Sequence, residues 1–574
     1  MLESGFFRDR DIDVNLDAST EPIWIGLSQL NDPPLYYFLA SIPLRIFPPY
    51  LQLTSQLYAA RFASVILYLA TLVAAYGLAR ELFPERHPLR LLIPLTVALL
   101  PGLADLMTSV NNDVIAVTLF SFFMWVSAAL IRRGVSIGRL LGAGAVVLLG
   151  ILSKNTVLVA LPLLAVALFF ALTRRQPRRM IWAVVVVSIV LFLLAALSFD
   201  DAAFWFRPRS NIPAERISMD SAPLGKHVLR LDWNSDQNKP QLLQVLPGDI
   251  KAGLLGQTAT VGAWLWATEP IRISSPALAY GQRITAQVEI GTEPEFHAIS
   301  AELEGNPRTA RIELAPATSQ NLKAPISVFV DGLILVEGTW PTEISPEFES
   351  IHGEQGTWGG RPFKNLARNG SFERPTLRLR PWVEQAVEEI IGEAFFAPPT
   401  VVFASLTDLR SSGEYYQSAA ANLFRTFWAK FGWGQVSLLG RRPYLVLGLV
   451  TGVALVGAAF LVSDQLRKRL ALPWEIYLFF GVSLIVIWGQ ALVRGAGSFD
   501  RNWIFIPAAR YAYPVVIPTI AILTIGLYWW IRLPEKLFGL RRWIKWAVFF
   551  GFFLALDVWS LLSIYIFFNG GVSG

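Results

Sequence analysis

Residues 112–131 read NDVIAVTLFSFFMWVSAALI, in which one charged residue, Asp113, is followed by a largely apolar run without further charges. An α-helix needs about 20 such residues to cross the roughly 30 Å of hydrocarbon in a bilayer. Similar runs recur along the chain, and we expect ten of them to span a membrane. They occupy residues 57–79, 89–107, 112–131, 138–154, 155–172, 180–199, 443–463, 474–493, 511–531 and 545–568. The predicted fold class is therefore a polytopic α-helical membrane protein.

The composition agrees with this fold class. Of the 574 residues, 53% are hydrophobic and only 16% are charged, which is rare in a soluble globular chain. The net charge of +6 is not gathered into a basic stripe, so we expect no nucleic-acid partner. The chain has no cysteine, which excludes disulfides, thiolate metal sites and cysteine nucleophiles.

Lysine and arginine predict the orientation, because short loops rich in them stay in the cytoplasm. The alternate loops that carry them include Arg80, Arg86, Arg90, Arg132, Arg133, Arg139, Arg174, Arg175, Arg178, Arg179, Arg467, Lys468, Arg469, Arg532, Lys536, Arg541, Arg542 and Lys545. The opposite ends are then extracytoplasmic. We therefore predict a multi-pass plasma-membrane protein with a large extracytoplasmic insert between residues 200 and 442.

The first residues fit this topology poorly, because residues 1–56 must lie outside without a signal peptide or a preceding span. We expect a first helix to be missing upstream of Met1; the alternative is an N-terminus that crosses the membrane unaided. The apolar run from Pro33 to Phe47 is too short to span and predicts a helix along the outer interface.

The insert differs in pattern from the spans. Its middle part alternates apolar and polar residues between Gly, Pro and Asn turns, which predicts a jelly-roll-like β-sandwich with strands such as 259–266, 283–289, 310–314 and 326–330. The predicted domains are an outer loop with an interfacial helix (1–56), six spans (57–199), a linker (200–225), the β-sandwich (226–375), amphipathic helices (376–442) and four spans (443–574).

Within the predicted sandwich, the phrases TVGAWLWA (260–267), VFVDGLILVEG (328–338) and NGSFE (369–373) resemble the jelly-roll carbohydrate-binding modules of extracellular enzymes. The resemblance implies that exposed aromatic rings stack on sugars, and it makes Trp340 and Trp358 the candidates. Trp264 and Trp266, two residues apart on one strand, are expected to face the sandwich core instead. The sandwich could equally brace its neighbours and bind nothing.

Polar residues gather at the predicted extracytoplasmic ends of the spans. The sequence has no Walker loop, no paired metal-ligand histidines and no serine-nucleophile elbow, so carboxylate, amide and Lys/Arg chemistry remains. The gathered residues are Asp105, Asn111, Asn112, Asp113, Lys154, Asn155, Asp500, Arg501, Arg510 and Tyr511. A lysine between apolar runs, such as Lys154, needs a cavity or a partner. Its structural alternative is an ion pair with Asp105 or Asp113.

Seven short sequence motifs, taken in their order along the chain, resemble those of the bacterial GT-C superfamily of membrane glycosyltransferases, of the protein-mannosyltransferase-like kind. The phrases that carry the resemblance are NDPPLYY (31–37), ARFAS (60–64), YGLARELF (76–83), LPG (100–102), SVNND (109–113), GILSKNT (150–156) and ARYAYP (509–514). The resemblance implies that a sugar moves from a polyprenyl-phosphate carrier to a glycan, lipid or protein acceptor of the cell envelope. The reaction would be an inverting displacement at the outer face of the membrane, with a carboxylate as base.

The resemblance also implies roles for residues. We expect Asp113 and Asp105 to be the catalytic carboxylates and Lys154 and Arg510 to bind the carrier phosphate. The remaining substrate-binding candidates are Asp32, Tyr36, Asn111, Asn112, Asn155 and Tyr511. The family's principal acid lies in the first outer loop, where Asp9, Asp11, Asp13 and Asp17 match its motif poorly, so an inactive truncated form is an alternative. No cofactor is required, although Asp113 with a phosphate could hold a divalent metal.

Two other function classes remain open on the sequence. A transporter or flippase for envelope glycans would also need polar residues among many spans, but nearer the membrane midplane. A glycan-binding membrane scaffold would retain the β-sandwich and would not catalyse sugar transfer.

Overall fold

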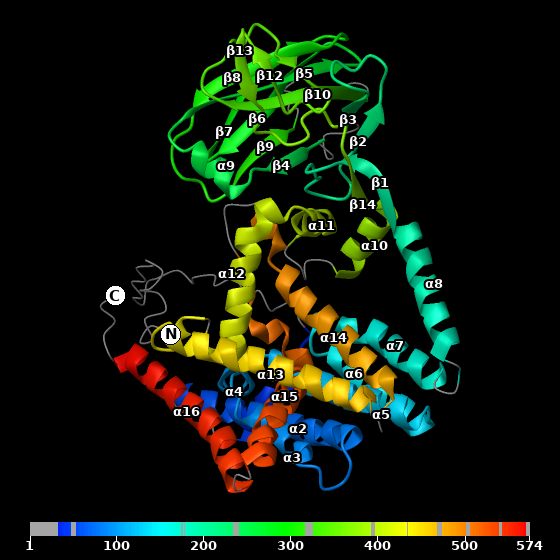
Figure 1. The fold of residues 1–574 in the computed structure, drawn as a ribbon, viewed down its shortest axis with the longest axis vertical. Coiled ribbons are helices and arrows are strands. Elements are labelled where there is room, and N and C mark those ends of the chain that lie inside the picture. The colour runs from blue at the N-terminus through cyan, green and yellow to red at the C-terminus, as the bar shows by residue number, and fades with distance from the viewer. Residues whose placement is uncertain are drawn as a thin grey trace. The chain divides into compact units, whose positions relative to one another are not determined.

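The structure is a computed structural model that describes residues 33–46, 53–173, 176, 178–233, 240–315, 325–391, 397–432, 434–467, 473–500, 505–538 and 542–569. The chain divides into two compact units (Figure 1). The helical unit comprises Met1–Gln176, Ala421–Ala491 and Ala508–Gly574, and the second unit comprises Pro177–Ala420 and Leu492–Pro507. Asp32, the acidic residues before it, Trp433 and Arg501 lie outside the described residues.

Eight helices among the described residues are long and apolar enough to cross a membrane. A ninth candidate is the pair Leu89–Ala98 and Pro101–Met107, whose two halves are bent by 65°. Residues 138–154, predicted as a span, form a helix of only 15 residues, Ile137–Ile151. The helices and the β-rich insert fit a helical membrane protein, and the described residues do not confirm the predicted count of ten spans.

The helical unit contains the N-terminal and C-terminal blocks of helices. They are α1 Leu35–Ile46, α2 Leu53–Leu82, α3 Leu89–Ala98, α4 Pro101–Met107, α5 Asp113–Arg133, α6 Ile137–Ile151, η2 Asn155–Val159, α7 Ala160–Thr173, α13 Arg442–Arg467, α14 Trp474–Val493, η5 Ala509–Tyr511, η6 Tyr513–Val515, α15 Val516–Phe538 and α16 Arg542–Asn569. The turn between α5 and α6 follows from its residues. Gly134 ends α5 with a φ of +84°, and the Ser136 hydroxyl accepts the Arg139 N–H at the start of α6.

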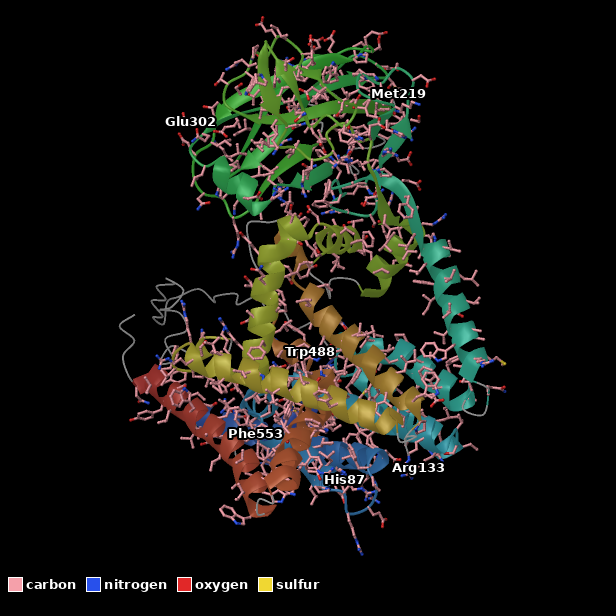
Figure 2. All side chains as sticks on the ribbon, viewed as in Figure 1. His87, Arg133, Met219, Glu302, Trp488 and Phe553 are labelled. Atoms are coloured by element: carbon pink, nitrogen blue, oxygen red, sulfur yellow. The ribbon has the colours of Figure 1, made fainter. Side chains whose placement is uncertain are left out.

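One end of the helical unit gathers arginines from several helix ends. Arg133 at the end of α5 forms an ion pair with the buried Glu81 at the end of α2. Arg90 at the start of α3 donates to the backbone oxygen of Phe83 at 2.9 Å. Figure 2 shows His87 and Arg133 at this end. The structure therefore brings together loops that the charge pattern assigns to one side of the membrane.

The second unit is built around two antiparallel sheets. One has the strand order β2-β3-β10-β5-β8 and the other β4-β9-β6-β7. Their strands are β2 Ala214–Ser218, β3 His227–Trp233, β4 Leu242–Val245, β5 Thr258–Ala267, β6 Ile271–Tyr280, β7 Gln282–Ile290, β8 Glu295–Glu302, β9 Ala310–Leu314 and β10 Ile326–Glu337. Apolar side chains from both sheets share one core, so the insert is a β-sandwich, as predicted. Strand β2 lies inside the segment that we expected to be a linker.

The two tryptophans of β5 do not face this core. Val261, Ala263 and Leu265 belong to the shared core, so Trp264 and Trp266 lie on the other face of the strand. There Trp264 packs against Phe296, with ring centroids 4.8 Å apart, and Trp266 stacks on Phe329. The expectation that this pair is packed holds, but the expected face is wrong because the five-stranded sheet is covered on both faces.

Further elements complete the second unit. A small sheet contains β11 Glu347–Phe348, β12 Gln355–Trp358 and β13 Arg361–Lys364, and a two-stranded antiparallel sheet pairs β1 Leu197–Ala202 with β14 Pro375–Leu379. The other elements are α8 Arg178–Ala196, α9 Gly248–Gly253, α10 Pro381–Ile391, α11 Pro399–Thr407, α12 Leu409–Trp428 and η4 Ala496–Phe499. Helix α12 continues into the helical unit, where β15 Lys430–Phe431 and β16 Val436–Ser437 follow it.

Candidate functional site

The site begins at the start of α5, where the apolar run of the helix meets a polar turn. Asp113 is the first residue of α5 and is buried. Its backbone N–H donates to Oδ1 of Asn111 at 2.9 Å, an interaction that holds the turn against the helix. A carboxylate at this position also interacts favourably with the positive end of the helix dipole.

Lys154 reaches the same place from a break between α6 and η2. Its backbone is extended, with φ −162° and ψ 130°, and its N–H donates to the backbone oxygen of Gly150 at 3.0 Å. Gly150 has no Cβ, and a Cβ there would lie 2.6 Å from Cγ1 of Val157. The glycine therefore lets the chain fold back closely enough to bring Lys154 into contact with its partners.

Lys154 and Asp113 form a buried ion pair. The Lys154 Nζ lies 2.6 Å from Oδ1 of Asp113 and 3.2 Å from Oδ1 of Asn112. Asn112 is fully buried. Because a lone buried charge is strongly unfavourable, each member of this pair requires the other. Of the two partners that the sequence allowed for Lys154, the structure selects Asp113.

Arg510 adds a second cation to this cluster. Its Nη2 donates to the Tyr511 hydroxyl at 2.7 Å, and its guanidinium carbon lies 4.8 Å from the centroid of the Tyr511 ring. Burial by itself lowers the pKa of Arg510, but Tyr511 and Asp113 outweigh it and raise the pKa above its usual value. Arg510 therefore stays charged beside Asp113.

The loop that carries Arg510 is fixed from α12. The N–H of Ala509 donates to the Thr426 hydroxyl at 2.8 Å, and the Tyr513 hydroxyl donates to the backbone oxygen of Thr426 at 3.0 Å. Both Thr426 and Tyr513 are buried. The predicted site residue Arg510 thus depends on a helix from the insert side of the sequence.

Tyr36 ties α1 and α2 to the same turn. Its hydroxyl lies 2.8 Å from the Ser64 hydroxyl and accepts the Asn111 N–H at 2.9 Å. The Ser64 hydroxyl donates to the backbone oxygen of Ser109 at 2.7 Å. Burial raises the pKa of Tyr36, so its phenol stays neutral and keeps its proton for these bonds.

Two further candidates have different surroundings. Asp105, on α4, is exposed, and its Oδ2 accepts the N–H of Gly432 at 3.1 Å. Asn155 is exposed at the start of η2. Neither residue shares the Lys154 contacts given above, so the buried cluster and these exposed groups are separate parts of the predicted site.

The aromatic candidates of the sandwich differ in exposure. Trp358 is fully buried, and its Nε1 donates to the backbone oxygen of Ile344 at 2.6 Å. Trp340 is half-buried, stacks on Trp358 with ring centroids 5.7 Å apart, and lies under the guanidinium of Arg361. Of the two, Trp340 is the ring that solvent can reach.

Sequence reasoning missed three positioning residues: Ser64, Ser109 and Thr426. Ser64 and Ser109 are part of phrases that carry the GT-C resemblance, but nothing in the sequence shows that they meet through Tyr36. Thr426 belongs to an amphipathic segment in which no sequence pattern distinguishes its hydroxyl.

Comparison with known proteins identifies a relationship for the N-terminal part of the chain. Residues 31–198 match the family model described as dolichyl-phosphate-mannose-protein mannosyltransferase. This segment contains Tyr36, Asp105, Asp113 and Lys154, whereas Arg510 lies outside it. The match indicates a membrane glycosyltransferase of the GT-C type. No curated protein matches the chain as a whole or in part.

Solved structures resemble only a fraction of the chain. The enzymatically active domain of bacteriophage CBA120 tailspike protein 4 is 9% identical, covers 25% of this chain and is itself covered to 19%, with a TM-score of 0.18. A CBM4 structure is 8% identical over 24% of this chain and 95% of its own, with a TM-score of 0.18. TmCBM61, solved with β-1,4-galactotriose, is 13% identical over 24% of this chain and 92% of its own, with the same TM-score of 0.18.

Proposed function

We propose that this protein is a membrane glycosyltransferase that moves a sugar from a polyprenyl-phosphate carrier to a glycan, lipid or protein acceptor at the extracytoplasmic face of the plasma membrane. The observation that carries the proposal is the buried Asp113–Lys154 ion pair with Arg510 beside it. The match of residues 31–198 to a mannosyltransferase family supports the reaction class.

The charges of this cluster suit a carrier phosphate. Asp113 contributes one negative charge, and Lys154 and Arg510 contribute two positive charges, so the cluster has a net charge of about +1. Lysine and arginine are the usual phosphate ligands, and a partly dry site strengthens their attraction. Lys154 and Arg510 would bind the phosphate, and Asp113 would hold both cations in place.

The reaction needs one carboxylate to accept a proton. The acceptor hydroxyl oxygen attacks C1 of the sugar, the bond from C1 to the phosphate oxygen breaks, and the phosphate leaves with the bonding electron pair. The hydroxyl proton passes to a carboxylate, and attack opposite the leaving group inverts C1. Asp105 is exposed and can meet an acceptor. Asp113 is the second candidate, and its ion pair favours a positioning role.

This chemistry requires no cofactor. Among the described residues, no group of three or more His, Asp or Glu side chains is arranged to hold a metal ion. A divalent metal at Asp113 would also bind oxygens of the carrier phosphate.

Two structural features favour transport as a second candidate. The 65° bend between α3 and α4, and the break at Lys154, are interrupted helices of the kind that transporters use for binding sites. A flippase would move the lipid-linked sugar across the bilayer without breaking the C1–phosphate bond.

A transfer assay in proteoliposomes separates these functions. Purified full-length protein is given radiolabelled polyprenyl-phosphate sugars and a mixture of envelope glycan, lipid and peptide acceptors. We expect labelled acceptor with the wild-type protein and a loss of about a hundredfold or more with Lys154→Ala. Glu81→Gln, which breaks a buried ion pair at the other end of the unit, is the matched control and should retain transfer. Movement of intact donor between leaflets without labelled acceptor would reject the transferase.

A further inference from the structure

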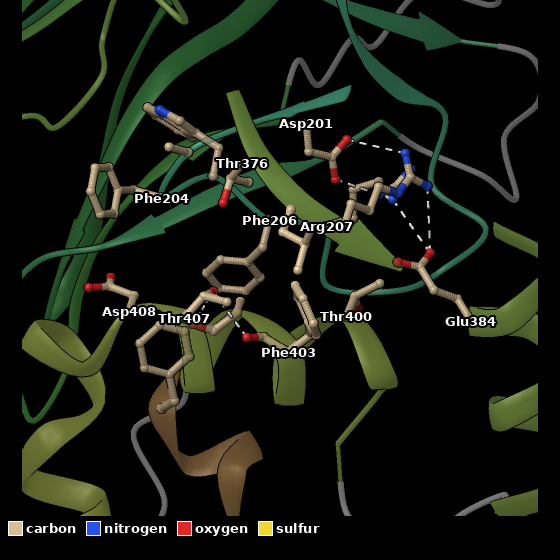
Figure 3. A pocket seen from close by; sticks show the side chains of 16 residues that line it. Asp201, Phe204, Phe206, Arg207, Thr376, Glu384, Thr400, Phe403, Thr407 and Asp408 are labelled. Atoms are coloured by element: carbon tan, nitrogen blue, oxygen red, sulfur yellow. Dashed lines mark hydrogen bonds and ion pairs between the residues drawn. The ribbon is translucent and has the colours of Figure 1, made fainter. Parts of the chain in front are cut away.

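The second unit contains a cavity of about 150 Å³ that is separate from the sandwich core. Its walls come from β1 and β14, the loop after β1, helices α10 and α11, and η4 (Figure 3). A buried water needs about 10 to 15 Å³ in the same measure, so the cavity has room for about a dozen non-hydrogen atoms. Such a space fits one sugar ring.

One side of the cavity is a buried network of four charges. Asp201 lies 3.1 Å from Arg378 and 3.5 Å from Arg207, and Glu384 lies 3.5 Å from Arg207 and 3.6 Å from Arg378. All four of these ion pairs are longer than the roughly 2.8 Å of a strong charged hydrogen bond. The oxygens and N–H groups of the network therefore have capacity left for a ligand.

Three polar atoms of residues that line the cavity have no hydrogen-bond partner in the part of the chain that the structure describes. They are Nε of Arg207, Nε of Arg378 and Oγ1 of Thr400. Arg207 is 5% exposed, Thr400 is 7% exposed and Arg378 is 9% exposed. Unpaired groups this deeply buried are unfavourable, so each would gain from a hydrogen bond to a ligand hydroxyl. Burial also raises the pKa of Glu384 and lowers that of Arg207, which indicates that both charged forms lack solvation.

The other side of the cavity is aromatic. Figure 3 shows the rings of Phe206 and Phe403 across from Asp201, Arg207 and Glu384. The Phe206 ring lies 5.4 Å from the ring of Phe499, so the wall continues into η4. Flat apolar rings opposite polar groups match the two kinds of surface on a sugar ring, its C–H face and its hydroxyl edge.

The charge balance selects among polar ligands. Two arginines and two carboxylates cancel, so the network offers no net attraction to an anion or a cation. We propose that this cavity is a binding site for one neutral monosaccharide residue, free or within a glycan, whose hydroxyls pair with Arg207, Arg378, Glu384 and Thr400 while its C–H face packs on Phe206 and Phe403. This site is not the sandwich surface at Trp340, and it requires no transfer chemistry.

The test is binding to the full-length protein in lipid nanodiscs, measured by saturation-transfer NMR. The probes are the methyl glycosides of glucose, galactose, mannose and arabinose, with methyl glucuronide as the charged probe. Thr400→Val removes the unpaired hydroxyl at constant shape, and Phe403→Leu removes a ring. Thr407→Val is the matched control, because Thr407 also lines the cavity but donates its hydroxyl to Phe403 O of its own helix at 3.0 Å.

We expect at least one neutral glycoside to bind with a millimolar dissociation constant. Thr400→Val and Phe403→Leu should each weaken that binding about fivefold or more, and Thr407→Val should change it less than about twofold. If Phe403→Leu lowers the thermal stability, the binding measured with Thr400→Val alone tests the proposal. The proposal is overturned if no neutral glycoside binds, if Thr400→Val binds as the wild type does, or if methyl glucuronide binds more tightly than every neutral probe. Because no step measures transfer, these outcomes do not depend on the proposed enzyme activity.

Discussion

The Nζ of Lys154 lies 2.6 Å from Oδ1 of Asp113, and the two side chains are only 10% and 7% exposed. Asp113 begins α5 and Lys154 lies in the break between α6 and η2, 41 positions away in the sequence. Because neither charge has access to bulk water, the pair couples the start of α5 to the break after α6. The same contact therefore affects both the stability of the helical unit and the shape of the site.

Breaking this pair from one side should destabilise the helical unit. We expect Lys154→Met to lower the free energy of unfolding by about 3 to 5 kcal/mol, because the buried Asp113 loses the cation that lies 2.6 Å from it. The double variant Asp113→Asn with Lys154→Met should recover most of this loss. Thermal unfolding of the detergent-solubilised protein measures both. A double variant that is as unstable as the single one would contradict the pairing.

Removal of the Tyr36 hydroxyl should lower transfer activity more than it lowers stability. In Tyr36→Phe the Asn111 N–H loses its acceptor and Ser64 loses a partner, so the turn before Asp113 loosens. We expect transfer to fall about tenfold with a stability loss of about 1 kcal/mol.

The matched control for Tyr36 is Tyr68→Phe. Tyr68, on α2, donates to the backbone oxygens of Val97 and Ala98 at 3.0 and 3.1 Å, whereas Tyr36 accepts the Asn111 N–H. Tyr68→Phe should show a similar loss of stability with nearly unchanged transfer. Equal losses of transfer in both variants would show that Tyr36 acts only through stability.

Helices α13 and α15 pack closely at a glycine, and this contact tests the fold. A Cβ on Gly526 would lie 1.7 Å from the backbone oxygen of Ala454. Small residues let helix backbones approach within a membrane. We expect Gly526→Ala to destabilise the protein by about 1 to 3 kcal/mol, whereas Gly551→Ala, on α16 in open space, should stay within about 0.5 kcal/mol. Equal unfolding temperatures for the two variants would contradict this packing.

The buried Asp331 predicts a pH dependence for the sandwich. Burial raises its pKa from 3.8 to about 8, although the N–H groups of Leu224 and Gly332 donate to it. Between these two pH values the folded state holds one more proton than the unfolded state, so stability falls as the pH rises through this window and levels off above it.

Asp331→Asn should remove that slope. Denaturant unfolding of the full chain, followed by tryptophan fluorescence between about pH 5 and pH 8, compares the two proteins. Parallel pH dependences in the wild type and Asp331→Asn would show that another group is responsible.

The sequence predicts the long apolar helices and the strands of the sandwich well, because both depend on local pattern. Strand 259–266, for example, appears as β5 Thr258–Ala267. Hydropathy could not reveal that Pro101 begins a new helix within the expected span 89–107, or that the chain leaves the helix before Lys154. An average over about 20 residues does not register a local break in the backbone.

Contacts between distant segments were harder to predict. The sequence narrowed the partners of Lys154 to Asp105 and Asp113, and only the packing of α6 against α5 selects Asp113. The sheet face on which Trp264 lies was predicted wrongly. The alternation of side chains along a strand shows which residues share a face, but when both faces are covered it does not show which face packs in the sandwich core. The charge network at Arg207 was not anticipated, since its four members come from residues 201, 207, 378 and 384.

The affinity of the protein for a sugar-free polyprenyl phosphate in nanodiscs tests the central claim most directly. If Lys154 and Arg510 bind the carrier phosphate, Arg510→Gln should weaken binding by about tenfold or more, and Glu81→Gln at the other end of the unit should leave it unchanged. Equal affinity in the wild type and in Arg510→Gln, with both proteins folded, would contradict the assignment of this cluster to the phosphate.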